Sequence, residues 1–255
     1  MLDLIRQAFA ADAFPVLAAT AGLAGLVRGF SGFGSAMILV PVASALTTPQ
    51  TAVVLLLFTD TLLALPLVAA AARRCRWREV LPLAVGALCT VPIGVRLLLV
   101  LDPALLRWII SLLILLLVAL LASGWRWSRP PSLLHTGLVG GASGLTGGMA
   151  GIAGPPVILF WMAGQGQPAS IRANIIVFFA LTGLFNLAAY FLSGLLTPER
   201  VAAGLALAPL YALALLLGAR AFGLASPRFF RTLALALCAF AAIAGMPLLE
   251  GLLQQ

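Results

Sequence analysis

The sequence predicts an all-α protein that crosses a membrane many times, with about eight hydrophobic segments in two homologous halves of four segments each. Three observations support this fold class: the composition, a series of long uncharged stretches, and a repeated glycine motif. Hydrophobic residues make up 63% of the 255 residues and charged residues only 9%, whereas about a quarter of a soluble domain is charged. This composition excludes a soluble enzyme and a nucleic-acid-binding domain.

Uncharged stretches follow one another along the chain, and a membrane-spanning helix needs about 20 apolar residues. Residues 1–13 contain Asp3, Arg6 and Asp12 and lack the features of a cleavable signal peptide, so we expect a short polar lead-in. The stretches that follow are Phe14–Val27, Gly29–Thr59, a segment through Asp60 to Ala72, Val80–Val95, Trp108–Trp125, Pro130–Ile171, Ala173–Pro198, Val201–Ala219 and Thr232–Leu249.

Two of these stretches, Gly29–Thr59 and Pro130–Ile171, are too long for one straight helix, and both contain a glycine cluster. The first cluster has glycine at 29, 32 and 34, and the second has eight glycines between positions 137 and 154, followed by two prolines. We expect the helix to break in each cluster. The first segment of each half is then broken, and it either crosses the membrane fully or is re-entrant.

The glycine motifs also reveal an internal repeat. Gly29-Phe-Ser-Gly32 matches Gly144-Leu-Thr-Gly147 at a spacing of 115 residues, and Gly94-Val-Arg96 matches Gly218-Ala-Arg220 at a spacing of 124. The predicted organisation is a first repeat over 14–124, a connecting loop over 125–131, a second repeat over 132–250 and a tail over 251–255.

The arginines favour an inverted relationship between the two halves. All 15 basic residues are arginine, and positive charges accumulate on the cytoplasmic side of a membrane. If the repeats are parallel, the two sides carry 8 and 6 arginines; if each broken segment returns to its side of entry and the repeats are inverted, the sides carry 10 and 4. We therefore expect inverted repeats with both termini outside.

Inverted repeats with paired broken helices are typical of secondary transporters, whose substrate site lies near the membrane midplane. A broken helix leaves unpaired N–H groups at its positive end, and an anion is their natural ligand. The alternative is that the glycines only allow helices to pack closely. The predicted substrate-binding residues are Arg28, Gly29, Ser31, Gly32, Gly34, Gly144, Thr146, Gly147, Gly148, Gly151, Gly154, Arg172 and Asn174.

Two ionisable residues interrupt the apolar stretches, and such residues are candidates for function. Arg28 could bind an anionic substrate, pair with Asp60 or extend to the membrane interface. Asp60 is the predicted coupling residue, as a proton carrier, with the alternative that it is only the ion-pair partner of Arg28.

No motif predicts catalysis, a metal site or a cofactor. The single histidine, His135, cannot form a metal site alone, and the cysteines at 75, 89 and 238 are far apart in the sequence. A P-loop, an HExxH motif and a nucleophile elbow are all missing from the sequence, which argues against an enzyme and against an ATP-driven pump.

The glycine and proline motifs resemble those of the TauE/SafE family of sulfite and organosulfonate exporters. The matching elements are GFSGFG at 29–34 with Pro41, GLTGG at 144–148, GIAGPP at 151–156, Val91–Gly94, Asp102-Pro103, Ile171–Asn174 and Ser226-Pro227 with Arg231. The resemblance implies a carrier of sulfite, sulfoacetate or related organosulfonates in the bacterial inner membrane. Ala52–Leu57 differs from the Thr-Asn-Lys-like element of many members.

The expected function is secondary transport of a small sulfur-containing anion, coupled to the proton gradient. The alternatives are a passive anion channel, a carrier of a non-sulfur anion such as a carboxylate, and a non-transporting membrane subunit. The expected partners are the anion and the lipid bilayer, with no nucleic acid; a homodimer is left open.

Overall fold

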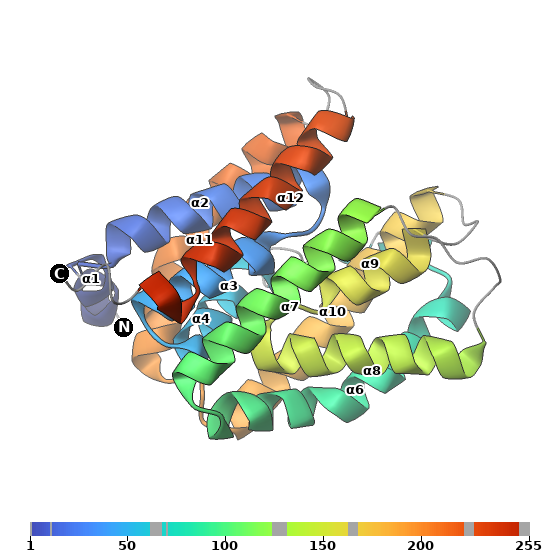
Figure 1. Ribbon diagram of the computed structural model, residues 1–255, viewed down its shortest axis with the longest axis horizontal. Helices are drawn as coiled ribbons and strands as arrows, with labels where there is room; N and C mark the ends of the chain where they lie inside the picture. The colour runs from blue at the N-terminus through green and yellow to red at the C-terminus, as the bar shows by residue number, and fades with distance from the viewer. Residues whose placement is uncertain are drawn as a thin grey trace.

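A computed structural model describes residues 2–10, 12–61, 68–69, 71–123, 132–162, 168–221 and 227–249. These parts of the chain form a bundle of helices (Figure 1). The α-helices are α1 (Leu2–Ala10), α2 (Phe14–Ser31), α3 (Ser35–Leu46), α4 (Pro49–Leu56), α6 (Trp77–Val100), α7 (Pro103–Ser123), α8 (Leu133–Ala150), α9 (Gly154–Met162), α10 (Pro168–Leu192), α11 (Pro198–Ala221) and α12 (Pro227–Ala244). A π-helical turn, η1 (Leu57–Thr61), follows α4, and a 3₁₀ turn, η2 (Pro247–Leu249), follows α12.

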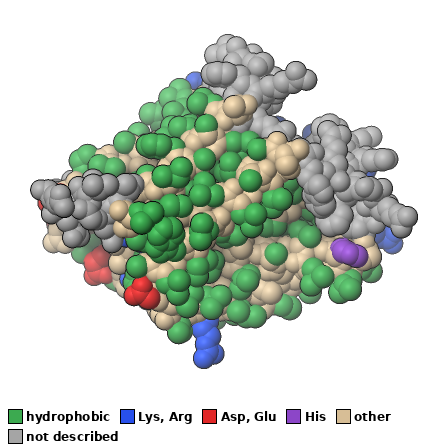
Figure 2. All heavy atoms as spheres, in the orientation of Figure 1, with side chains coloured by type: hydrophobic (Ala, Val, Ile, Leu, Met, Phe, Trp, Pro, Cys, Tyr) green, Lys and Arg blue, Asp and Glu red, His purple; other side chains and the backbone are tan. Residues whose placement is uncertain are grey.

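Several helices are suited to a lipid environment. Among the described residues, four helices are long and apolar enough to cross a membrane: Trp77–Val100, Pro103–Ser123, Ser170–Leu192 and Pro198–Arg220. Four shorter helices of apolar composition accompany them, and each belongs to a segment that the sequence predicts. Hydrophobic side chains cover much of the visible face of the molecule (Figure 2). The all-α prediction is confirmed for the described residues, and the bundle has the composition of a polytopic membrane protein.

A helix break lies in each of the two glycine clusters, as the sequence predicts. Helix α2 is capped at its C-terminus by Gly32, whose φ is 78°, and α3 begins after Gly34, whose φ is 96°. Helix α8 is capped by Gly151, with a φ of 67°, before α9. These left-handed conformations favour glycine, because a side chain would be strained there. The other α8 glycines, from 137 to 148, lie inside a continuous helix.

Two helix pairs make equivalent contacts. Helix α2 packs along α11, and α8 packs along α6. The glycines that allow these close approaches match: a Cβ atom on Gly29 would overlap the Leu215 carbonyl, and a Cβ atom on Gly148 would overlap the Val91 carbonyl. The further matched pairs are Gly25 with Tyr211 and Gly144 with Ala87, then Gly218 with Leu26 and Gly94 with Leu145.

These matched contacts suggest a different spacing between the two glycine motifs from the one that the sequence predicts. They relate α2 to α8 at a spacing of 119 residues, since Gly29 corresponds to Gly148. The helix ends agree, because Gly32 corresponds to Gly151. The contacts therefore favour a spacing of 119 over the spacing of 115 for α2 and α8, and they agree with the spacing of 124 for α6 and α11. Figure 1 also shows α2 and α8 running in opposite directions, as do α7 and α12.

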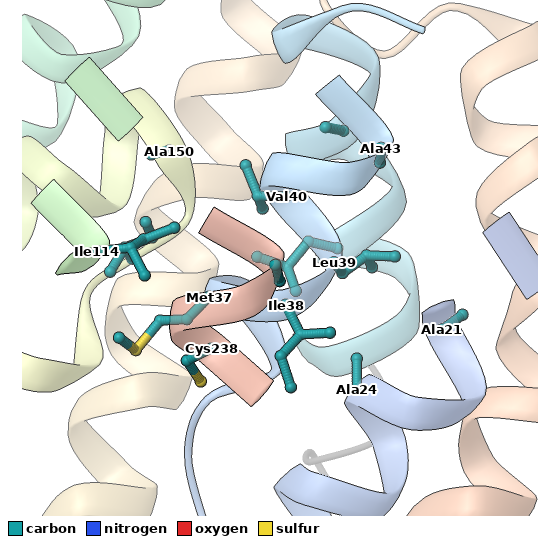
Figure 3. Packing of buried hydrophobic residues seen from close by; sticks show 14 of the residues in the cluster. Ala21, Ala24, Met37, Ile38, Leu39, Val40, Ala43, Ile114, Ala150 and Cys238 are labelled. Carbon is teal, nitrogen blue, oxygen red and sulfur yellow. The ribbon is translucent and has the colours of Figure 1, made fainter. Parts of the chain in front are cut away.

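Helix α3 lies at the centre of the largest hydrophobic cluster. Its residues Met37–Val40 are at most 1% exposed, and they pack among side chains from α2, α7 and α12 (Figure 3). Ala24, Ile114 and Cys238 are among the neighbours that Figure 3 labels. Burial of this short helix fixes its first turn, and therefore the break at Gly32–Gly34, in the middle of the protein.

Candidate substrate site at the two helix breaks

Both helix breaks line one cavity. Its volume is about 70 Å³, which is several times the space that a single buried water molecule needs. Gly34–Met37 line it from the first break and Gly151–Pro155 from the second. Leu57 and Asp60 of η1 and one face of α10 complete the wall, together with Arg28 near the end of α2.

Arg28 and Asp60 form an ion pair in this wall. The Arg28 Nε atom donates to Asp60 Oδ1 at 3.0 Å, and the two side chains are 14% and 20% exposed. The Tyr211 hydroxyl donates to the same oxygen at 2.6 Å, and Ser35 is within hydrogen-bonding reach of that hydroxyl. The Arg28 guanidinium also lies over the Phe179 ring, 5.0 Å from its centroid, where a cation is attracted to the ring face.

Asp60 belongs to a π-helical turn, in which each backbone hydrogen bond spans five residues instead of the four of an α-helix. Such turns are rare in proteins as a whole, and many of those that occur lie at functional sites. Neighbouring Thr59 is buried and its hydroxyl donates to the Leu55 carbonyl at 2.9 Å. The turn therefore directs the Asp60 carboxylate toward Arg28, and the Thr59 hydroxyl supplies a hydrogen bond to the Leu55 carbonyl.

The first break supplies more hydrogen-bond donors than the second. The first helical bond of α3 runs from the Ile38 N–H group to the Gly34 carbonyl, so the N–H groups of Ser35–Met37 have no partner within the helix. Helix α9 begins Gly154-Pro155-Pro156, and proline has no N–H group. The first turn of α3 therefore presents more backbone N–H groups at its positive end than the first turn of α9 does.

Arg28 retains donors for a ligand. A guanidinium group has five N–H groups. Among the described residues, Nε bonds to Asp60 and Nη1 donates to the Gly32 carbonyl. The remaining N–H groups and the first turn of α3 together could bind a small anion.

Helix α10 forms a wall of the cavity that was not predicted from the sequence. Phe179, Thr182, Asn186 and Tyr190 all line the cavity. The Tyr190 hydroxyl donates to the Gly148 carbonyl at 3.1 Å, and Asn186 Nδ2 donates to the Gly147 carbonyl at 3.4 Å. Thr182, Asn186 and Tyr190 recur every four residues, so polar groups on one face of an apolar helix were the signal that could have identified them.

Five of the predicted site residues line the cavity: Arg28, Gly34, Asp60, Gly151 and Gly154. The carbonyl of Gly32 bonds Arg28 at the edge of the first break. The side chain of Ser31 lies outside the described residues.

The other predicted glycines and Thr146 support the helices. Gly29, Gly144 and Gly148 face the backbone of a neighbouring helix, so their environment matches the packing interpretation. Gly147 faces Ala153 across the second break. The Thr146 hydroxyl donates to the Ile152 carbonyl at 2.7 Å and ties the end of α8 to the break.

Arg172 and Asn174 lie away from the cavity. Arg172 is exposed. Asn174 is fully buried and joins the two halves: its Oδ1 accepts from the Arg76 N–H group at 2.8 Å, and its Nδ2 donates to Glu79 Oε2 at 2.9 Å. Asn174 therefore holds α10 against the start of α6 and the residue before it, and it does not face the cavity.

Comparison with known proteins identifies the family. The sequence model described as Sulfite exporter TauE/SafE matches residues 17–245. The chain belongs to the TauE/SafE family. The match spans both helix breaks and both halves, so the whole cavity lies within the region that TauE/SafE proteins share. Searches of curated proteins and of solved structures return no match.

Proposed function

We propose that this member of the TauE/SafE family is a proton-coupled secondary transporter of a small sulfur-containing anion, such as sulfite, sulfoacetate or a related organosulfonate. Its proposed location is the bacterial inner membrane. The observation that carries the proposal is the single cavity at both helix breaks, which contains Arg28 and Asp60.

The ion pair provides a mechanism for coupling. With Asp60 ionised, the positive charge of Arg28 is neutralised and an anion gains little by binding. When Asp60 takes up a proton, the guanidinium loses its partner, and a buried unpaired charge is costly. An incoming anion then replaces the carboxylate at Arg28, so the proton and the anion occupy the cavity together.

The arrangement of the helices supports alternating access. Helices α2 and α8 correspond and run in opposite directions (Figure 1), and each packs along a helix of the other half. We propose that the halves are inverted repeats. Rocking of one repeat against the other would then expose the cavity to each side in turn.

Transport in liposomes tests this function. Purified protein would be reconstituted, and uptake of radiolabelled sulfite or of a short sulfonate measured against concentration and against imposed pH gradients. We expect saturable uptake, counterflow driven by unlabelled anion, and faster uptake from the acidic side. Flux without saturation or counterflow would indicate a passive channel.

The same measurement separates sulfur anions from carboxylates. Both carry charge and acceptor oxygens that suit Arg28 and the first turn of α3. Competition by acetate and glycolate against labelled sulfite would therefore be measured in parallel. Stronger competition by the carboxylates than by sulfonates would replace the sulfur assignment and keep the transporter.

A further inference from the structure

One residue of the cavity wall carries a hydrogen-bond acceptor that the anion mechanism does not use. Asn186 lines the cavity and is 8% exposed. Its Oδ1 atom is buried, and no donor among the described residues reaches it. A buried carbonyl oxygen without a hydrogen-bond partner destabilises the folded protein, because its interaction with water is lost and not replaced. Such an atom therefore requires an explanation.

The neighbouring carbonyl groups determine the orientation of this amide. Asn186 Nδ2 donates to the Gly147 carbonyl at 3.4 Å, and the Tyr190 hydroxyl also approaches that oxygen at 3.4 Å. Exchanging the two ends of the amide would place Oδ1 against the Gly147 oxygen, with two acceptors facing one another. The acceptor end of Asn186 is therefore the end left for a ligand.

Thr182 adds to the same surface. It lies one turn before Asn186 on α10 and also lines the cavity. Its hydroxyl already donates to the Phe178 carbonyl at 3.0 Å, which leaves its oxygen lone pairs as acceptors. The wall of α10 is thus an acceptor surface, whereas Arg28 and the first turn of α3 form a donor surface.

We propose that the transported anion carries a hydrogen-bond donor, such as a hydroxyl group, which Asn186 recognises through Oδ1. This inference rests on the proposed function and narrows its substrate class. The acidic head group binds at Arg28 and the donor binds at α10, so a hydroxylated sulfonate or a protonated oxyanion is preferred over the same anion without a donor. The small volume of the cavity restricts the cargo to a head group with a short chain.

Two other occupants could satisfy Oδ1, a sodium ion and a resident water molecule. A cation is disfavoured because Arg28 and the positive end of α3 line the same small cavity. A resident water would satisfy the amide equally with every anion and would give no selectivity. Both possibilities therefore make predictions that differ from ours.

Matched pairs of anions test the proposal on the wild-type protein. The first pair is 2-hydroxyethanesulfonate and ethanesulfonate, and the second is glycolate and acetate. Dissociation constants come from thermal stabilisation of the purified protein as a function of anion concentration, in sodium salts and in choline salts. We expect the hydroxylated member of at least one pair to bind at least tenfold more tightly in both salts.

Variants assign the preference to Asn186. In Asn186→Leu, the ratio of the two dissociation constants is expected to fall to about one, mainly because the hydroxylated anion loses affinity. Thr90→Val is the matched control: Thr90 bonds the Gly141 carbonyl between α6 and α8 at 2.7 Å, outside the cavity wall. This control should keep the wild-type ratio. If Asn186→Leu does not fold, the wild-type comparison still decides.

Equal affinities within both pairs would overturn the donor requirement and leave the proposed function standing. A preference that disappears without sodium would overturn it in favour of a cation. A preference that survives Asn186→Leu would remove Asn186 from recognition. If no anion of either pair stabilises the protein and labelled sulfite is not transported, the proposed function fails as well.

Discussion

The Tyr211 hydroxyl donates to Asp60 Oδ1 across 151 residues of sequence, at 2.6 Å. This bond joins α11 of the second half to η1 of the first half. The same carboxylate oxygen accepts from Arg28 on α2, and α2 packs along α11. The Asp60 carboxylate therefore ties together α2, η1 and α11, and the proposed coupling depends on this shared contact.

The first prediction concerns Asp60, the proposed proton carrier. Asp60→Asn removes the titratable group and releases Arg28 from its ion pair. We expect anion binding to become tighter, on the order of fivefold, because a competing charge is removed, while a pH gradient no longer drives uptake. Binding would be measured by thermal stabilisation and transport in liposomes at several pH values.

Glu79→Gln is the control for this variant. Glu79 is a carboxylate outside the cavity that bonds Arg76 and Asn174. Its replacement should leave the pH dependence of transport unchanged. Full pH-driven uptake by Asp60→Asn would exclude Asp60 from coupling.

The second prediction concerns Arg28. Arg28→Lys keeps the positive charge but loses the planar group that bonds Asp60 and the Gly32 carbonyl together. An ammonium group binds as a point charge and cannot form the same fork of hydrogen bonds. We expect anion binding to weaken by about tenfold or more, with the protein still folded. Unchanged affinity in the titration would show that charge alone is sufficient.

The third prediction concerns the glycines between helices. Gly29→Ala and Gly148→Ala each place a methyl group against backbone, at Leu215 and Val91 respectively. The α2–α11 and α8–α6 pairs pack along their length, so the helices cannot separate locally to admit the methyl group. Each variant should therefore lose about 1–3 kcal/mol of stability. Thermal unfolding in detergent would measure the loss.

Gly137→Ala provides the comparison within α8. A Cβ atom there meets no other atom within 4 Å, and alanine is the better helix former by about 1 kcal/mol. This variant should be as stable as the wild type or more stable. Equal losses in all three variants would show that the close approaches do not determine stability.

The fourth prediction concerns Cys75, in the loop before α6. Partial burial raises the pKa of its thiol above the ordinary value, so less thiolate is present at neutral pH and reaction with a maleimide speeds up only as the pH rises past that ordinary value. Labelling would be measured against pH in a variant with Cys89→Ser and Cys238→Ser. A rate that rises at the ordinary thiol pKa would contradict the effect of burial.

The same thiol reports the orientation of the protein. Cys75 lies among Arg73, Arg74, Arg76 and Arg78, and such a cluster is expected on the cytoplasmic side. A membrane-impermeant maleimide should therefore label it in inside-out vesicles and not in right-side-out vesicles. Labelling from the opposite side would reverse the predicted topology.

The composition and the glycine content were enough to predict the class of protein and the two clusters within which the helices break. A chain with so few charges can only bury its apolar side chains in lipid, and Gly32, Gly34 and Gly151 adopt backbone conformations that other residues rarely accept. The pairing of Arg28 with Asp60 was one of the alternatives that the sequence left open, and the structure contains it.

The pairing of α2 and α8 with their partner helices, the contacts of most glycines and the α10 wall of the cavity depend on how the helices pack. Where glycines recur every four residues, a sequence alignment shifted by four positions still pairs glycine with glycine. The sequence therefore fits spacings of 115 and 119 about equally well, and the contacts of Gly29 and Gly148 with their partner helices distinguish the two. Because glycine has no Cβ atom, it allows the close approach of a neighbouring helix as readily as that of a ligand, and the sequence does not distinguish the two. Likewise, the polar residues of α10 become a site only because packing turns that face toward both breaks.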